Sequence, residues 1–373
     1  MTSMLDRRHF LASASGALAA GSALSANDDP DQFSFVLLGD LHFDKLEHHD
    51  FPKLEEKHQG DIRQIHNYSR ITSDIMPALF ARVREAVASE RAAFVLQVGD
   101  LVEGLCGSED LAVTQNREAV EFVKSARLGV PFLFTKGNHD VTGDGAPAAF
   151  GHVFHPFLSE QTSSFQGAGK LNSANYAVQH HDSLFCSFDA YDKSSLDWLE
   201  SALAKRTARH CFVAIHPPVV PYGARSTWHL YSSAKDAARR EKLLGLLGRE
   251  NAIVLGGHIH KYNLIARETA GGGRFTQLAI SSVIGEKSVK PRNELAGIDS
   301  YTGDQIRVEP EFSPTTEPER RTVYDAERPF VKRFEYADLP GYAVVTVHQS
   351  RIIARIYSGV SDQIWKTIDL ATS

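Results

Sequence analysis

Cysteine is scarce in this chain of 373 residues: there are three, and no two of them form a C-x-x-C pair. Such a set indicates neither a disulfide framework nor a zinc site built from thiolates. Cys186 and Cys211 lie in the apolar runs SLFCSF and HCFVAI, which favours buried and inert thiols. An oxidising compartment would still permit one bridge, so the sequence leaves their pairing open.

The chain also lacks an excess of positive charge. Its 40 Lys and Arg against 46 Asp and Glu leave a net charge of −6, which gives no general attraction to nucleic acid or to an anionic membrane. The Ala/Ser/Gly-rich stretch that ends near Ala26 is too short and too poor in Leu, Ile and Val to span a bilayer, so we expect no transmembrane segment in the mature protein. Internal repeats and a linker to a second folded domain are also missing.

The N-terminal residues carry an export pattern. Arg7 and Arg8 are followed by Phe10, Leu11 and a weakly hydrophobic stretch, which resembles a bacterial twin-arginine signal. We therefore predict that residues 1–26 are a signal peptide, recognised by the twin-arginine export machinery and removed on export to the periplasm or beyond. That route carries folded proteins, so a cofactor can be bound before export. The alternative is a disordered basic leader.

Short apolar runs alternate with helix-like segments along the rest of the chain. The expected strands are 33–38, 92–98, 130–135, 211–215, 251–256 and 275–284. The expected helices are 71–89, 195–205 and 233–248, with hairpins at 175–189 and 341–358. This alternation predicts an α/β fold with a largely parallel sheet covered on both faces.

We expect one folded domain over residues 33–365. Within it, residues 285–335 are dense in charge and proline and show no periodicity. They are predicted to form a long surface insertion, which would be functional or disordered.

Polar residues follow each of the first five predicted strands. In chain order they are Asp40 and His42, then Asp100, then Asn138, His139 and Asp140, then His216, and finally His258 and His260. Ligands bind outside the carboxyl ends of parallel strands, so these side chains should meet at one site. Carboxylate and amide oxygens with imidazoles, and no thiolates, suit a pair of divalent cations such as Mn, Fe or Zn.

The motifs GDLH, GDLVE, GNHD, AIHPP and GGHIH occur in this order, each after a predicted strand. Together they resemble the signature of the calcineurin-like metallophosphoesterases, and the resemblance covers about residues 35–358. It implies a four-layer αββα sandwich, in which two mixed sheets are flanked by helices and a dinuclear metal site lies at the carboxyl ends of the strands.

The resemblance also implies a role for each polar residue. Asp40, His42 and His260 would bind the first metal, Asn138, His216 and His258 the second, and Asp100 would bridge them. His139 would face the substrate, protonating the leaving oxygen or stabilising charge on the phosphoryl group. Glu103 and Asp140 would not bind the metals but would orient the ligand residues through hydrogen bonds.

Glu103 is a departure from the family pattern, which usually has Asp at this position. It is expected to orient His139, with a changed hydrogen-bond geometry. Purple acid phosphatases lack the histidine that corresponds to His42 and use a tyrosine ligand where this chain has Glu103. That subfamily is disfavoured.

The implied activity is hydrolysis of a small phosphate monoester or diester by a hydroxide that two metals activate, without a covalent phosphoenzyme. A narrower alternative is a diesterase for cyclic nucleotides or lipid head groups. Another is an exported protein that binds phosphate or metal and is catalytically weak.

Candidate substrate contacts are Arg70, Tyr222 and Trp228, from the stretches 59–70 and 219–231. His48, His49 and His58 are interpreted as a solvated stretch, with an accessory metal contact as the alternative.

Overall fold

The computed structural model describes residues 32–166, 169–223, 227–302 and 316–371. The predicted signal peptide, residues 1–26, lies outside the described residues. Among the described helices, none combines the length and the apolar character that crossing a membrane requires.

The smaller of two sheets has six strands in the order β14-β13-β12-β1-β2-β3. Their bounds are β1 Phe33–Leu38, β2 Val95–Gln97, β3 Phe132–Phe134, β12 Gly341–Val347, β13 Ile352–Ser358 and β14 Ile364–Asp369. β1, β2 and β3 are parallel, whereas β12 pairs with β1 in the antiparallel sense. The strands predicted at 33–38, 92–98 and 130–135 are confirmed, the last two in shortened form, and β14 continues past the predicted domain end at 365.

The larger sheet has eight strands in the order β10-β11-β8-β9-β7-β6-β5-β4. Their bounds are β4 Tyr176–His180, β5 Ser183–Phe188, β6 His210–Ile215, β7 Ile253–Gly256, β8 Tyr262–Glu268, β9 Arg274–Ala279, β10 Arg292–Ala296 and β11 Val331–Asp338. β5, β6, β7 and β9 are parallel, and the other pairings are antiparallel. Both sheets are therefore mixed, so the expectation of a largely parallel sheet holds only for their central strands.

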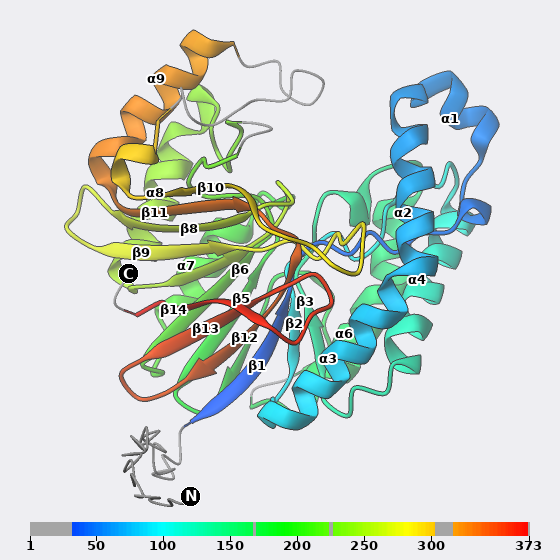
Figure 1. Cartoon of the computed structure of the whole chain (residues 1–373), viewed down its shortest axis with the longest axis horizontal. Helices are drawn as coiled ribbons and strands as arrows, with labels where there is room; N and C mark the ends of the chain where they lie inside the picture. Colours follow the sequence, from blue (N-terminus) through cyan, green and yellow to red (C-terminus); the bar gives the residue numbers. More distant parts are fainter. Residues whose placement is uncertain (1–31, 167–168, 224–226, 303–315, 372–373) are drawn as a thin grey trace, which may run out of the picture.

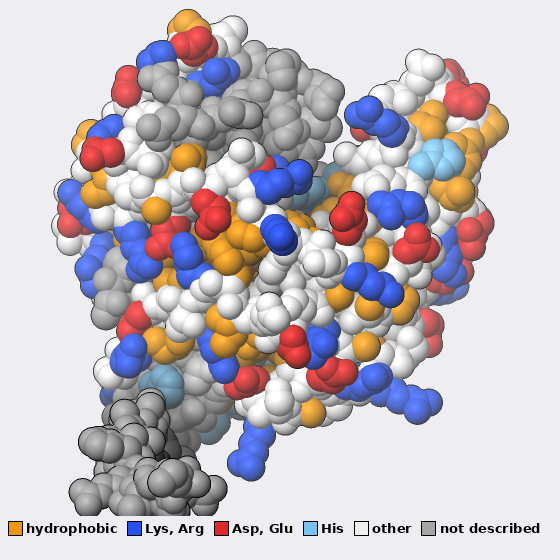
Figure 2. All heavy atoms as spheres, in the orientation of Figure 1, with side chains coloured by type: hydrophobic (Ala, Val, Ile, Leu, Met, Phe, Trp, Pro, Cys, Tyr) orange, Lys and Arg blue, Asp and Glu red, His pale blue; other side chains and the backbone are white. Residues whose placement is uncertain are grey.

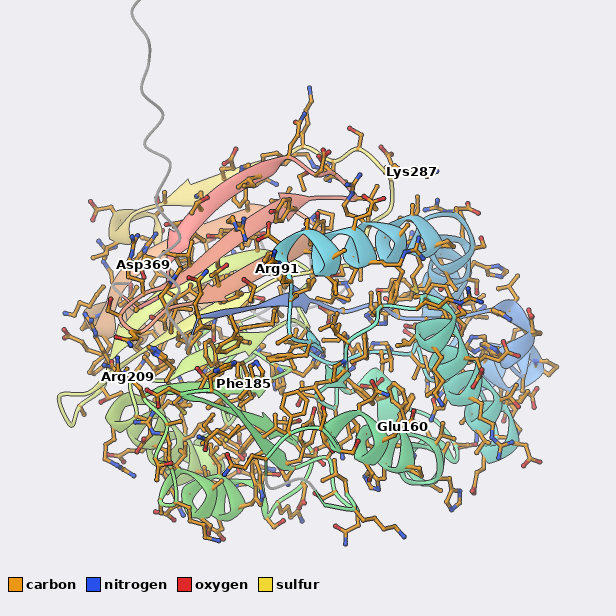
Figure 3. All side chains as sticks on the ribbon, turned by 90° about the horizontal axis from the view of Figure 1, so that it is seen from below. Arg91, Glu160, Phe185, Arg209, Lys287 and Asp369 are labelled. Atoms are coloured by element: carbon orange, nitrogen blue, oxygen red, sulfur yellow. The ribbon has the colours of Figure 1, made fainter. Side chains whose placement is uncertain are left out.

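The two sheets pack face to face through apolar side chains. Phe35 of β1 meets Phe185 of β5 and Phe212 of β6 edge-on, with ring centroids 5.4 and 5.7 Å apart. Figure 3 views this packing from below and labels Phe185 on β5. Aromatic rings bury large apolar areas, so this interface forms the main core.

Helices cover the outer faces of both sheets (Figure 1). On the smaller sheet's side lie α1 Phe51–Lys57, α2 Ile62–Asp74, α3 Met76–Glu90, α4 Glu109–Ser125, α5 Ala146–Ala149 and α6 His155–Thr162. On the larger sheet's side lie α7 Ser195–Leu203, α8 Ala237–Arg249 and α9 Glu317–Glu327. The expected αββα sandwich is confirmed.

One predicted helix is wrong in its extent. Residues 71–89 form parts of two helices, since α2 ends at Asp74 and α3 begins at Met76. Pro77 occupies the first turn of α3, where its missing N–H leaves no hydrogen bond unmade. The spacing of apolar residues continues through the break, so periodicity alone did not reveal it.

Residues 285–335 were predicted to form a surface insertion, but much of this segment is part of the folded domain. β10 and the first residues of β11 join the larger sheet, and α9 precedes β11. Tyr301 and Tyr324 are fully buried, with ring centroids 4.9 Å apart. Because charged residues surround them, these buried positions could not be recognised from the sequence. Residues 303–315 lie outside the described residues.

A buried ion triad fastens α9 to the rest of the protein. Glu327 accepts hydrogen bonds from Arg240 of α8 and, at 2.8 Å, from Arg267 of β8. Burial raises the pKa of Glu327, but the two guanidinium groups outweigh burial and hold the pKa below its usual value. The carboxylate is thus ionised at neutral pH and balances two nearly buried cations.

We predict that Glu327→Gln lowers the free energy of unfolding at pH 7 by about 3 kcal/mol, because two arginines lose their buried partner. A depressed folded-state pKa gives stability that is present above the ordinary pKa and disappears as pH falls. The difference between variant and wild type should therefore shrink on acidification. Urea unfolding between pH 7 and pH 3 measures this difference.

Glu317→Gln, which breaks an exposed pair with Arg321 on the same helix, is the control and should have little effect. Equal effects of the two substitutions would contradict the prediction.

Candidate metal centre

The carboxyl ends of β1, β2, β3, β6 and β7 bring the predicted ligands together. The smaller sheet supplies Asp40, Asp100 and Asn138, and the larger sheet supplies His216 and His258. Figure 2 shows the surface hollowed between the α1–α2 end and the α9 end of the molecule, with histidine visible in the hollow. The site is therefore assembled from both sheets.

Two groups of ligand atoms share one carboxylate. The first group is Asp40, His42, Asp100 and His260, and the second is Asp100, His216 and His258. Within each group the ligand atoms lie within 4.8 Å of one another. Asn138 joins the second group, because its Oδ1 is 2.9 Å from His258 Nδ1. All seven predicted ligands thus lie in two adjoining clusters, with Asp100 in both.

The protonation pattern of the imidazoles fits metal binding. His216 Nδ1 donates to the carbonyl of Val98 at 2.8 Å, which leaves a lone pair on Nε2. That Nε2 is 2.9 Å from Asp100 Oδ2, which is also an acceptor. Two facing acceptors require a proton or a cation between them. In the same way, His42 donates from Nδ1 to Glu103 at 2.6 Å and turns its Nε2 toward His260 Nε2, 3.0 Å away.

Asp40 gives a second test of fit. Its side chain is completely buried, and Oδ2 has no hydrogen-bond partner among the described residues. A buried unpaired carboxylate oxygen is unfavourable unless it binds a cation. Burial accordingly raises the pKa of Asp40. The donor set and this orphaned oxygen together fit a pair of hard or borderline divalent cations.

Four of the predicted ligands have a left-handed backbone, which is uncommon for residues other than glycine. The φ angles are 49° at His42, 56° at Asp100, 70° at His258 and 58° at His260. Strained backbone of this kind persists where the surrounding structure enforces it, commonly at functional sites. Here all four residues lie within four positions of the end of a strand.

Glycines leave the space that the carboxylates fill. A Cβ on Gly257 would lie 2.5 Å from Asp40 Oδ2, and a Cβ on Gly137 would collide with Asp100 Oδ1. Gly137 of GNHD and Gly257 of GGHIH are thus required by close packing against Asp100 and Asp40.

Asp100 remains ionised at the centre of the site. Burial raises the pKa of Asp100, but His216, His139 and His42 outweigh burial and lower the pKa well below its usual value. Its Oδ1 accepts from the backbone N–H of His139 at 2.8 Å. An ionised carboxylate with one oxygen fixed in this way suits a bridging ligand.

Glu103 contacts two histidines of the predicted site. Its carboxylate accepts from His42 Nδ1 at 2.6 Å and lies 3.2 Å from His139 Nδ1, while its carbonyl lies 2.7 Å from the same Nδ1. Burial raises the pKa of Glu103, but His139 and His42 outweigh it and lower the pKa to about 2. The sequence led us to expect contact with His139, and the structure adds the contact with His42.

Asp140 supports the site through the backbone. It is buried and accepts from the N–H groups of Asp100, Val102 and Gly137 at 3.1, 3.1 and 2.8 Å. It thereby connects the loop after β2 to the loop after β3. This position agrees with the supporting role expected for it.

One face of α2 packs behind the first metal cluster. Gln64, Tyr68 and Thr72 are spaced by four residues and therefore lie on the same face of the helix. Gln64 donates to Glu103 Oε1 at 3.1 Å, and the Tyr68 ring stacks on His42 with centroids 4.2 Å apart. This role of α2 was not predicted from the sequence, although the four-residue spacing in QGDIRQIHNYSR is a signal for it.

The three expected substrate contacts differ in position. Trp228 is 42% exposed, and its ring centroid lies 5.2 Å from that of His258. Tyr222 has no exposed surface, and its hydroxyl donates to the carbonyl of Gly257 at 3.2 Å. Arg70 is exposed on α2 and donates to Asn67 at 3.1 Å. Of the three, only Trp228 is shown as an exposed side chain in contact with a metal-cluster residue.

The interpretation of His48 and His49 as solvated is wrong, because both side chains are buried. His49 Nε2 lies 2.7 Å from Asp44 Oδ1, and its Nδ1 lies 3.1 Å from the carbonyl of Leu105. The carboxylate partner makes burial favourable, and residue type alone does not reveal such a partner. His58 is half-buried, 3.6 Å from Asp61.

The three cysteines all lie in the described part of the chain, and all are buried and free. Cys186 and Cys211 are therefore not joined. Burial raises the pKa of Cys211 to about 12, as expected for an inert thiol.

We predict that Glu103→Gln weakens binding of the first metal by 10- to 100-fold, because it removes the charge that orients His42. Metal content after dialysis against graded chelator, measured by mass spectrometry, tests this. Glu121→Gln, an exposed substitution on α4, serves as the control. Unchanged retention of both metals in Glu103→Gln would contradict the prediction.

Comparisons with known proteins agree with this architecture. A structure of the purple acid phosphatase PPD1 from yellow lupin has a TM-score of 0.53 at 11% identity; the match covers 91% of this chain and 53% of the lupin chain. This chain thus spans about half the length of the lupin protein. A structure of PhoD has a TM-score of 0.52 at 14% identity, covering 91% and 68% of the two chains. At these identities the likeness shows the fold alone.

A third structure is that of GAP50, the anchor in the inner membrane complex of Plasmodium, with a TM-score of 0.50 at 14% identity, covering 91% of this chain and 88% of that one. No curated protein matches the sequence. Residues 33–262 match the sequence profile of the family described as calcineurin-like phosphoesterase. That match spans more than half of the chain and includes every predicted metal ligand, and the chain therefore belongs to the calcineurin-like phosphoesterase family.

Proposed function

We propose that the protein is a metal-dependent hydrolase of phosphate esters that uses two divalent cations. The observation that carries the proposal is the membership of Asp100 in both ligand clusters. Asp40, His42 and His260 would complete the first site, and Asn138, His216 and His258 the second. Two bound cations would supply Lewis acidity at the phosphoryl oxygens and an activated water as the nucleophile. Mn, Fe and Zn suit these ligands equally.

His139 is proposed as the proton donor to the leaving oxygen. Its Nδ1 faces the carbonyl and carboxylate of Glu103, so Nε2 is the nitrogen left for the substrate. Burial lowers the pKa of His139, but Glu103 and Asp100 outweigh burial and raise the pKa to about 10. A protonated ring held in one orientation meets the requirements of a general acid.

The proposed substrate is a small phosphate monoester or diester. The cluster geometry supports either, because both present phosphoryl oxygens to the cations. Trp228 lies beside the second cluster and is retained as a substrate contact. Arg70 contacts Asn67 of its own helix, and Tyr222 is buried against the carbonyl of Gly257. Neither contact adds support for a role in substrate binding.

We predict that His139→Asn lowers kcat by roughly 10²- to 10⁴-fold while both metals stay bound, because it removes only proton donation. Asp100→Asn should remove activity and weaken both metal sites together. The measurement is hydrolysis of matched monoesters and diesters by metal-loaded protein, with metal content determined on the same samples.

Asp110→Asn, an exposed substitution at the start of α4, is the control and should retain wild-type rates. If wild-type protein retains two metals but hydrolyses no ester faster than Asp100→Asn, the proposal fails. A catalytically weak protein that binds phosphate or metal would then be the better description.

Export by the twin-arginine machinery to the periplasm or beyond is also proposed, on the strength of Arg7 and Arg8. Replacing both by lysine should leave uncleaved precursor in the cytoplasm of a bacterium that has this route. Cell fractionation followed by mass spectrometry of the N-terminus would show it. Unchanged processing of the lysine variant would contradict the proposal.

A further inference from the structure

Two exposed aromatic side chains border the metal centre. The large apolar side chains exposed among the described residues are Leu46, Tyr191, Trp228, Ile298 and Ile364. Tyr191 and Trp228, 38% and 42% exposed, lie in the segments after β5 and β6. These parallel strands end at the edge of the sheet where the ligands gather. The two aromatic rings of this set are thus placed beside the site.

Trp228 reaches the centre directly. Its ring centroid is 5.2 Å from that of His258, at an interplanar angle of 51°. His258 is a member of the second cluster, whose other residues are Asn138, His216 and Asp100. The indole, which is 42% exposed, is therefore next to the second metal position.

Tyr191 is connected to the same cluster through a short chain of contacts. Its N–H donates to Asp189 Oδ1 at 2.9 Å, and the Asp189 carboxylate forms an ion pair with Lys136, two residues before Asn138. Part of the Tyr191 side chain stays exposed.

Arg239 holds the two segments side by side. Its guanidinium donates to the carbonyl of Lys193 at 3.3 Å and to the hydroxyl of Tyr231 at 3.2 Å, and it stacks on the Tyr231 ring at 4.3 Å. Lys193 is two residues after Tyr191, and Tyr231 is three residues after Trp228. The loops that carry both exposed rings are therefore fastened to one another.

We propose that Tyr191 and Trp228 form an aromatic subsite that binds the base of a nucleotide ester while its phosphate lies at the metals. The inference rests on the proposed function and specifies its substrate class. Stacking on aromatic side chains binds any nucleobase, since every base has a π-face. A cationic head group is the other ligand of aromatic sites. It is disfavoured here because Lys136 already neutralises the nearby carboxylate of Asp189.

The test compares esters that differ only in the base. Adenosine 5′-monophosphate is paired with ribose 5-phosphate, and the methyl phosphodiester of each forms a second pair. Wild-type protein should have a higher kcat/KM for the adenosine member of the pair that it hydrolyses. Trp228→Ala and Tyr191→Ala should each reduce that preference roughly tenfold, whereas Trp228→Phe, which keeps a stacking surface, should retain most of it.

The control is Ile364→Ala, which removes an apolar side chain of similar exposure on β14, the edge strand of the smaller sheet. It should leave the preference for adenosine unchanged. Metal content is measured for every variant, because Trp228 touches a ligand. An equal preference in wild type, Trp228→Ala and Tyr191→Ala would overturn the inference. A preference for phosphocholine over adenosine monophosphate that Trp228→Ala removes would also overturn it.

A binding measurement separates this inference from the proposed function. Titration calorimetry of the metal-loaded protein with adenosine 5′-monophosphate and with ribose 5-phosphate does not require turnover. If no ester is hydrolysed but the adenosine compound binds more tightly and Trp228→Ala abolishes the difference, the subsite stands and the hydrolase proposal fails. If esters are hydrolysed and the two compounds bind equally, the subsite fails and the hydrolase proposal stands.

Discussion

The site depends on how Asp100 is packed among histidines. One oxygen of its carboxylate accepts the N–H of His139, and the other lies 2.9 Å from His216. The backbone of Asp100 is in turn tied to the carboxylate of Asp140, and Gly137 has no side chain to displace it. Loops after β2, β3 and β6 are thereby fixed relative to one another. A change in any of them would move the residue that the two clusters share.

The sandwich explains why the clusters can be so compact. Each sheet contributes only part of the predicted ligands, and the aromatic packing of Phe35, Phe185 and Phe212 holds the two sheets together. Asp40 shows the result at atomic scale. It follows β1 of the smaller sheet, yet it forms a bridge with Ser281 and accepts the N–H of His258, both from the larger sheet's side.

Sequence reasoning succeeded where a strand ends in a motif, because a short apolar run followed by Gly and a ligand is a local pattern. It predicted that Asp40, Asp100, Asn138, His216 and His258 would meet, and they do. It did not find Gln64 and Tyr68, whose role depends on how α2 packs. It also did not find Tyr191, whose backbone N–H is held by the carboxylate of Asp189. It also misjudged His49 and the segment 285–335, since burial of a polar residue depends on partners distant in the sequence.

The position of β1 has a consequence for how the protein matures. β1 lies between β2 and β12, and β12 comes from residues 341–347 near the end of the chain. The pairing of β1 with β12 therefore cannot form before residues 341–347 have been synthesised. Contacts this distant in sequence form late and slowly. Any metal binding that requires β1 to be paired with β12 would therefore follow the synthesis of β12.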